Sequence, residues 1–251
     1  RLGQLLDMAD SCKLDVEITV LNGWLSGFAF YPSFCSTSSK RRKGIFTHPH
    51  LIEAEKLLFS EIAHRVVNHL RFMGFDIGNE MNVLSYQGED FTVEEGDKWL
   101  TEMMKHCEKI APDKLHVFGV DHTPWFSDSS FSREILASAG KLTSLHAWIE
   151  FTGALSKYGP TGVGCLHLAE YCIELSKAYS ASNERQIWIQ EFGATPEWME
   201  EDTIPHFAEQ TIINALSCDK VWGFTWWCSH DIDEKFKDFD PLARYAEDSL
   251  V

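Results

Sequence analysis

The sequence predicts an α/β fold built around a parallel sheet, and three observations support this. Six short apolar runs recur along the chain, and each is followed by a helical pattern or its beginning. Strict alternation of strand and helix is typical of parallel sheets. The runs are short and mainly apolar, without the alternation of a half-exposed strand, which indicates strands buried on both faces. Polar residues gather after the same end of the predicted strands, where a barrel of such units places its chemistry.

The six predicted strands share β-branched and aromatic residues and are bounded by turn residues. They cover residues 16–21, 71–78, 115–120, 142–147, 187–190 and 221–226. Their order along the chain leaves room for one helix after most strands. The sequence therefore predicts one domain of alternating strands and helices, without internal repeats and without a linker between domains.

Helices are predicted from apolar residues at three- and four-residue steps. Residues 51–70 carry the clearest such pattern, and Thr92 with Glu95 forms a capping box that opens a helix to about residue 110. The remaining helices are expected at 2–13, near 131–139, at 165–180, at 203–217 and from 241 to 250. The Ser/Thr-rich stretch 26–50 is expected to be an irregular connection, and such long loops are often functional.

Composition narrows the function. The chain has 251 residues and 44% hydrophobic content, enough for one large domain over 1–251. With 22 Lys and Arg against 38 Asp and Glu, its net charge is −16, which argues against nucleic-acid binding. No apolar run reaches the ~18 residues of a membrane span. The seven cysteines form no C-x-x-C pair, so neither a disulfide framework nor a zinc site is indicated.

The residues that follow the strands form the most informative set. In chain order they are Asn22 and Trp24, Asn79 and Glu80, Asp121 and His122, His146 and Trp148, Glu191, Trp226 and Trp227, and then His230 and Asp231. Glu80 and Glu191 each end an apolar run. Two carboxylates that face one another are what glycoside hydrolysis requires.

These residues resemble the pattern of clan A glycoside hydrolases, the retaining (β/α)8 TIM-barrel enzymes that include the cellulases and mannanases of family 5. Asn79-Glu80 matches the family's Asn-Glu after the fourth strand, and Gln190-Glu191-Phe192-Gly193 matches the nucleophile motif of the seventh. His146 matches a sixth-strand His. Trp227, with Trp226 as a second candidate, matches the Trp platform of the eighth strand.

The resemblance departs from the family at two points. Family 5 often has a Tyr two residues after the sixth-strand His, whereas this chain has Trp148. Because Trp accepts no hydrogen bond, we expect the partner of the nucleophile to differ or to come from elsewhere. If Glu80 ends the fourth strand, residues 16–21 form the third, and we expect the first strand, first helix and second strand to be missing from this sequence.

The resemblance implies a mechanism and a substrate class. Glu191 would be the nucleophile and Glu80 the acid and then the base, with a pKa raised by burial and by the charge of Glu191. The substrate would be a β-linked oligo- or polysaccharide of mannan or glucan type, bound without a metal or organic cofactor. The expected substrate contacts are Asn79, His146, Trp227 and Trp226, with Trp24, Asn22, Phe28, Phe30, Tyr31, His122, Trp125 and Trp148 as further candidates. Asp76 is expected to be a buried structural group.

Two alternatives stay open. A metal-dependent hydrolase on the same fold would need converging ligands, and His48 with His50 is the available His-x-His pair. A carbohydrate-binding protein without activity would keep the fold and bind sugar without releasing reducing ends.

Overall fold

Parallel strands form the framework of the fold, as the sequence predicts. The computed structural model describes residues 1–25, 28–29, 39–86 and 91–228. Its strands are β1 (Val16–Asn22), β2 (Trp24–Leu25), β3 (Phe28–Ala29), β4 (Phe72–Asn79), β5 (Leu142–His146), β6 (Gln186–Phe192) and β7 (Val221–Trp226). β1 pairs in parallel with β4, and β6 pairs in parallel with both β5 and β7. Among the described residues the strands form three separate sheets, β1–β4, β2–β3 and β5–β6–β7, so the barrel is not closed.

The predicted strand 115–120 lies beside β4 but makes only one bridge, between Val117 and Asp76. The reason is that side chains take over ladder hydrogen bonds. The N–H of Phe75 donates to the ring of His116, and the N–H of Gly119 donates to the carboxylate of Asp76. The segment therefore follows β4 as a strand would, while regular pairing is interrupted on both sides of the bridge.

The helices follow the predicted order, with short additional turns between them. They are α1 (Leu2–Ser11), α2 (Ser39–Thr47), α3 (Pro49–Val66), α4 (Val83–Tyr86), α5 (Val93–Ile110), α6 (Thr123–Phe126), α7 (Arg133–Leu136), α8 (Ala154–Tyr158), α9 (Val163–Leu166), α10 (Leu168–Tyr179), the 3-10 turn η2 (Glu201–Thr203) and α11 (Ile204–Ala215). The capping box of Thr92 and Glu95 opens α5 as expected. The helix predicted at 165–180 is divided into α9 and α10, which share His167 as C-cap and N-cap.

The prediction of an irregular stretch over 26–50 is wrong in part. The β2–β3 hairpin begins before it, and α2 occupies Ser39–Thr47. Ile45 and Phe46 anchor this helix in the core, and the ring of Phe46 stacks on Phe91. Two apolar residues in a polar segment are too few to give a helical period, so the pattern did not reveal the helix.

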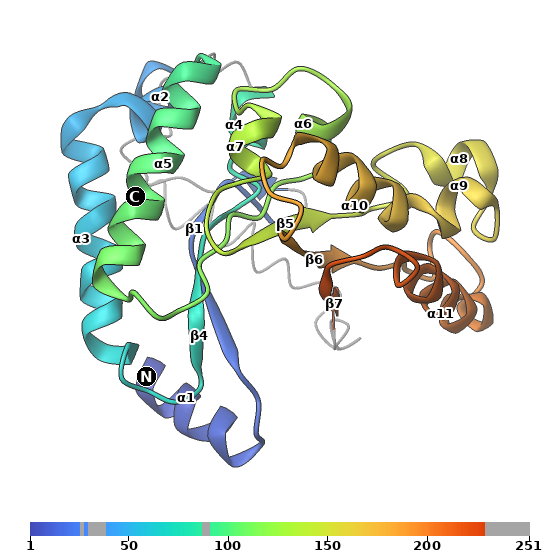
Figure 1. The fold of residues 1–251 in the computed structure, drawn as a ribbon, viewed down its shortest axis with the longest axis horizontal. Coiled ribbons are helices and arrows are strands. Elements are labelled where there is room, and N and C mark those ends of the chain that lie inside the picture. The colour runs from blue at the N-terminus through green and yellow to red at the C-terminus, as the bar shows by residue number, and fades with distance from the viewer. Residues whose placement is uncertain (26–27, 30–38, 87–90, 229–251) are drawn as a thin grey trace, which may run out of the picture.

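The helices flank the strands on two sides, which leaves the ends of the strands free to form a site (Figure 1). α3 and α5 lie side by side next to β1 and β4, whereas α10 and α11 lie against the β5–β7 side. One hydrophobic core runs through these layers, with Trp99, Phe59 and Phe75 among its largest fully buried side chains. None of the helices in the described ranges is long and apolar enough to cross a membrane. The predicted helix at 241–250 lies outside the described residues.

Candidate active site

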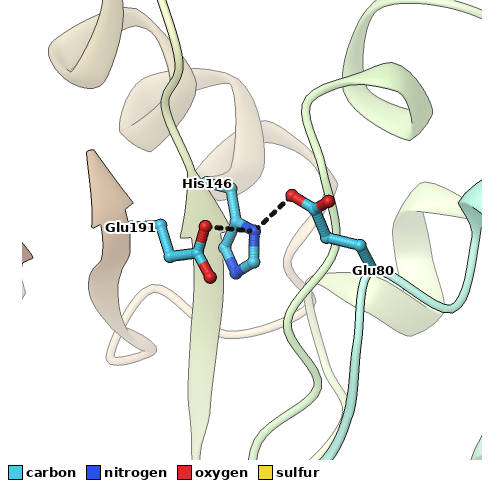
Figure 2. Close-up of side chains that lie close together, drawn as sticks. All are labelled: Glu80, His146 and Glu191. Carbon is cyan, nitrogen blue, oxygen red and sulfur yellow. Dashed lines mark hydrogen bonds and ion pairs between the residues drawn. The ribbon is translucent and has the colours of Figure 1, made fainter. Parts of the chain in front are cut away.

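Glu80, His146 and Glu191 meet where three strands end (Figure 2). His146 Nδ1 lies 2.8 Å from Glu80 Oε1 and 3.4 Å from Glu191 Oε2, so the imidazole stands between the two carboxylates. All three side chains are buried. An oxygen of Glu80, a ring nitrogen of His146 and an oxygen of Glu191 lie within 4.8 Å of one another. The two glutamates that the sequence singles out therefore share one site.

Local backbone irregularities aim these side chains. Glu80 follows β4 in the left-handed region, with φ 49°, and its N–H donates to Gly119 O at 2.8 Å. Non-glycine residues seldom adopt this conformation, and such strain concentrates at functional sites. On the other side, the pairing of β5 with β6 passes from Leu145–Ile189 to His146–Glu191, which makes Gln190 an extra residue. A bulge of this kind re-aims the side chains beside it.

The electrostatics of the site favour bound protons. Burial raises the pKa of Glu80, and the charge of Glu191 adds to the rise, while the hydrogen bond from His146 opposes it. The direction agrees with the sequence-based expectation. Burial lowers the pKa of His146, but the charge of Glu191 and the hydrogen bond with Glu80 outweigh it and raise the pKa to about 10. At neutral pH the site thus holds more protons than free side chains would.

Trp148 itself is a hydrogen-bond partner of Glu191, so the partner differs from the family's Tyr, as expected, and need not come from elsewhere. Its indole Nε1–H donates to Glu191 Oε2 at 3.1 Å. A carboxylate needs donors, and the indole N–H is one.

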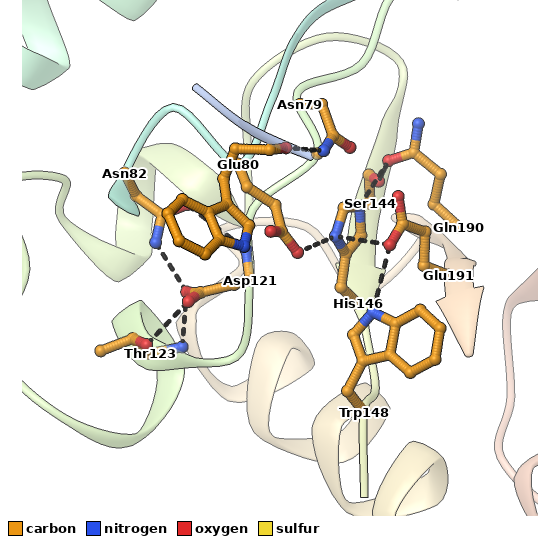
Figure 3. A network of polar contacts seen from close by, with 12 residues as sticks. Asn79, Glu80, Asn82, Asp121, Thr123, Ser144, His146, Trp148, Gln190 and Glu191 are labelled. Carbon is orange, nitrogen blue, oxygen red and sulfur yellow. Dashed lines mark hydrogen bonds and ion pairs between the residues drawn. The ribbon is translucent and has the colours of Figure 1, made fainter. Parts of the chain in front are cut away.

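A polar network continues from Glu80 along the chain (Figure 3). Asn79 Nδ2 donates to the backbone oxygen of Trp24 at 2.6 Å, which fixes the amide beside the site. Asp121 accepts from Asn82 Nδ2 at 2.6 Å and from the N–H of Thr123 at 2.8 Å. These bonds hold the segments after β4 and after residue 120 together.

A cavity of about 580 Å³ opens over the two glutamates. Aromatic side chains make up much of its wall, and they are Trp24, Trp148, Phe151, Trp198, Trp226 and Trp227. Trp227 is 40% exposed and Phe151 is 62% exposed, which is unusual for large apolar side chains. Exposed aromatic faces beside polar groups suit the apolar faces of sugar rings.

Gly193 allows the wall to close around the site. A Cβ at this position would stand 2.4 Å from the backbone oxygen of Trp227 and 3.1 Å from the ring of Trp148. The motif after Glu191 therefore needs a glycine, because two aromatic residues of the cavity approach its backbone. The peptide bond between Trp227 and Cys228 is cis.

Not every candidate reaches this cavity. Asn22 lines a second cavity of about 550 Å³, which lies between β1 and β6 and also reaches Glu191 and Trp227. His122 precedes α6 and lies beside Phe126, and Trp125 is a buried core residue. Neither His122 nor Trp125 lines either cavity. Phe30, Tyr31, His230, Asp231 and the side chain of Phe28 lie outside the described residues.

Gln190 and Glu17 belong to the site and were not selected from the sequence. Gln190 Nε2 donates to Glu17 Oε2 at 2.9 Å, and its oxygen accepts from Ser144 Oγ. Asp76, expected as a buried structural group, is fully buried and accepts from Thr19 and from two backbone N–H groups. The signal that could have found Gln190 is a polar residue inside an otherwise apolar strand.

The convergence of two carboxylates and an imidazole could also suit a metal ion. However, His146 Nδ1 points between the carboxylates at hydrogen-bonding distance, so a proton can occupy the position between them. His48 and His50, with ring centroids 5.5 Å apart, stand exposed at the start of α3 and are not part of this group. The described residues therefore give the His-x-His pair no further ligands.

Solved structures with the same fold were found by comparison. A GH5_18 protein from Streptomyces cattleya, solved in complex with GlcNAc, is 33% identical, covers 96% of this chain and superposes with a TM-score of 0.87. A GH5_18 protein from Bifidobacterium longum subsp. longum is 31% identical over 95% of the chain, with a TM-score of 0.86. The chain has the barrel fold of glycoside hydrolase family 5. It spans 58% and 57% of the length of these two proteins.

More distant structures share the fold alone. An exo-β-1,4-mannosidase from an Opitutaceae bacterium is 19% identical and superposes with a TM-score of 0.73. The match covers 99% of this chain and 44% of that protein. No family model matches the sequence. No curated protein matches it either. The family 5 likeness therefore rests on the fold together with the third of positions that are identical to the GH5_18 structures.

Proposed function

We propose that this chain carries the catalytic site of a retaining β-glycosidase that hydrolyses β-mannosidic bonds. The observation that carries the proposal is the pair Glu80 and Glu191, whose nearest oxygens lie within 4.8 Å beneath an aromatic cavity. Retaining enzymes place their carboxyl groups roughly 5–5.5 Å apart, whereas inverting enzymes leave room for a water at about 6.5–9.5 Å. The short separation supports direct attack by one carboxylate.

The reaction proceeds by double displacement. Glu191 attacks the anomeric carbon while Glu80 gives its proton to the glycosidic oxygen, which leaves with the aglycone. Glu80 then takes a proton from a water whose oxygen attacks the anomeric carbon, and the bond to Glu191 breaks. The raised pKa of Glu80 supports the first step, since the acid must be protonated before it can donate.

The remaining residues of the site orient the two glutamates and the sugar. Trp148 donates to Glu191 and fixes the carboxylate that attacks. Asn79, held by the backbone oxygen of Trp24, is placed to bond a sugar hydroxyl. Trp227 offers a partly exposed ring to the sugar face.

The substrate we propose is a β-mannoside whose leaving sugar is GlcNAc or mannose. Of the two sugar types that the sequence left open, mannan and glucan, the similar structures favour the first. A variant of the Streptomyces cattleya protein was solved in complex with Manb1-4GlcNAc, and more distant structures are a mannosidase and a mannanase. The cavity of about 580 Å³ is of the size that binds a small ligand.

The experiment uses this chain with 4-nitrophenyl β-mannoside and with Manβ1-4GlcNAc. Glu191→Gln is expected to abolish turnover. Glu80→Ala is expected to lose most activity and to regain it with azide on an activated aryl mannoside, because azide needs no general base. Glu209→Gln, an exposed position on α11, serves as the matched control.

Wild-type rates in both Glu80→Ala and Glu191→Gln would overturn the assignment. Binding of Manβ1-4GlcNAc without release of reducing ends by the wild-type chain would instead favour a sugar-binding protein without activity.

A further inference from the structure

Gln190 lies directly behind the site, with hydrogen-bonding groups on both sides of its amide. It is the extra residue of the bulge in β6, and its side chain is buried inside the barrel. Its oxygen accepts from Ser144 Oγ and lies 3.3 Å from His146 Nε2 (Figure 3). Its Nε2 donates to Glu17 Oε2 at 2.9 Å and faces Asp76 Oδ2 at 3.5 Å.

These neighbours favour one orientation of the amide. If the amide were turned over, its oxygen would face the carboxylates of Glu17 and Asp76, and its NH₂ group would face the ring of His146. The orientation of a glutamine amide is assigned from such a network. Because the oxygen faces His146, the ring nitrogen Nε2 must carry a hydrogen to make a favourable contact.

The fixed hydrogen on Nε2 decides what happens at the other ring nitrogen. Nδ1 lies 2.8 Å from Glu80 Oε1, a distance at which one atom must donate. With Nε2 protonated, the neutral ring has a lone pair on Nδ1. The contact then holds either an imidazolium beside a carboxylate or a carboxylic acid beside a neutral imidazole. In both cases the pair shares one proton.

We propose that Gln190 is a positioning residue that holds a proton on His146 Nε2 and thereby keeps a second, shared proton between His146 Nδ1 and Glu80. Its role in catalysis rests on the proposed function, in which Glu80 must be protonated before the first step. Loss of the shared proton is unfavourable in either tautomer. If Nδ1 carried no hydrogen, its lone pair would face the carboxylate of Glu80. If Nε2 carried none, its lone pair would face the oxygen of Gln190.

Other charged groups act on the same ring and are common to the wild type and to variants at Gln190. Glu191, on β6, lies 3.4 Å from His146 Nδ1. The charge of Asp76, on β4, raises the pKa of His146. The charge of His146 in turn lowers the pKa of Glu17, on β1, and that of His122. The charge of Asp121, in the segment after residue 120, raises the pKa of Glu80. A change that follows removal of the amide alone therefore reports the contact with Gln190.

The test is the pH dependence of kcat/KM on an aryl mannoside for wild type, Gln190→Met and Gln190→Glu. In Gln190→Met, Nε2 no longer faces an acceptor, so the neutral Nδ1–H tautomer becomes accessible. The basic limb is expected to move down by about one pH unit, the loss of roughly one hydrogen bond. Gln190→Glu keeps an oxygen toward Ser144 and His146, so its basic limb is expected to stay in place or rise. Gln186→Met, an exposed position at the start of β6, is the matched control.

A second measurement does not depend on activity. The ¹⁵N shifts of the His146 ring, assigned by comparison with His146→Gln, are expected to show a protonated Nε2 in the wild type at all accessible pH values. In Gln190→Met, His146 is expected to lose one proton at lower pH. Unchanged ring shifts in Gln190→Met, or a variant that lowers the rate equally at every pH, would overturn the proposal. An inactive wild type with the expected shifts would contradict the proposed function and leave the role of Gln190 standing.

Discussion

The hydrogen bond from Trp148 to Glu191 gives the sharpest test of how the nucleophile is oriented. We consider Trp148→Phe, which removes the indole N–H but keeps an aromatic ring. The ring of Trp148 packs edge-on against Phe151 and Trp198, with centroids 6.1 and 5.9 Å away. A phenyl ring can keep much of this packing. The substitution therefore removes mainly the donor that lies 3.1 Å from Glu191 Oε2.

The expected loss follows from the charge of the acceptor. Hydrogen bonds to charged groups contribute about 1.5–3 kcal/mol. If that contribution is made in the transition state, it corresponds to a fall of about 10- to 100-fold in kcat/KM, because each 1.36 kcal/mol is tenfold in rate. We expect kcat and kcat/KM to fall together, since an orienting bond acts on the chemical step more than on substrate binding.

The assay is steady-state hydrolysis of an aryl β-mannoside, with urea unfolding measured in parallel. Trp99→Phe is a matched control, because Trp99 Nε1 also donates to a carboxyl oxygen, Glu55 Oε2, at 2.9 Å. Trp99 is buried in the core between α3 and α5, away from the cavity. This variant is expected to unfold at lower urea and to keep its rate per folded molecule.

A Trp148→Phe variant that loses less than threefold in kcat/KM would contradict this role of the indole N–H. A loss that matches that of Trp99→Phe would also count against it, because it would point to general destabilisation. A rise in KM with unchanged kcat would place Trp148 in sugar binding and not in orientation of the nucleophile.

Two further outcomes are expected. Gly193→Ala forces a Cβ against the backbone oxygen of Trp227, 2.4 Å away, so activity on an aryl mannoside is expected to fall at least tenfold while circular dichroism stays near that of the wild type. Burial raises the pKa of Glu55 to about 8 from 4.5, so the stability that its bound proton contributes is full below about pH 4.5 and is lost as the pH rises through 8. Glu55→Gln removes this pH dependence. In urea unfolding, the variant is expected to be about 2 kcal/mol more stable than the wild type at pH 8 and no more stable than the wild type at pH 4. A full pKa shift would contribute about 1.4 kcal/mol of stability for each unit, and we expect less because the side chain of Glu55 is partly exposed to solvent.

The sequence allowed prediction of those parts of the fold that depend on burial. β4, β6 and β7 are mainly apolar runs, and the structure forms each of them within two residues of the predicted limits. Their order along the chain, with helices between, also fixed which ends meet. Glu80 and Glu191 could therefore be selected, because the carboxyl ends of parallel strands lie at one end of the barrel.

What could not be predicted depends on contacts between distant residues. The carboxylate of Asp76 takes the N–H of Gly119, and this interrupts a strand whose composition is correct. The bulge that inserts Gln190 arises from pairing with β5, and no local pattern announces it. For Trp148 the residue type was known, but whether its N–H would reach Glu191 depends on the path of the chain after β5.

The bulge links two features of the site, the buried amide of Gln190 and the carboxylate of Glu191. In a regular strand, successive side chains point to opposite faces, so Gln190 and Glu191 could not both serve one interior. With the extra residue, Glu191 reaches the cavity while Gln190 contacts the carboxylates below it. Burial raises the pKa of Glu17 and of Asp76, as it does that of Glu80.

Four carboxyl groups, those of Glu17, Asp76, Glu80 and Glu191, therefore lie around the imidazole of His146. They cannot all be ionised, because like charges in a buried site repel strongly and each desolvated charge is costly. Protons must remain among them at neutral pH, and the structure limits where these protons can reside. The amide of Gln190 supplies donors to Glu17 and Asp76, so these two need fewer protons. The contact between Glu80 and His146 is then a place where a proton is retained, and this is where a general acid requires one.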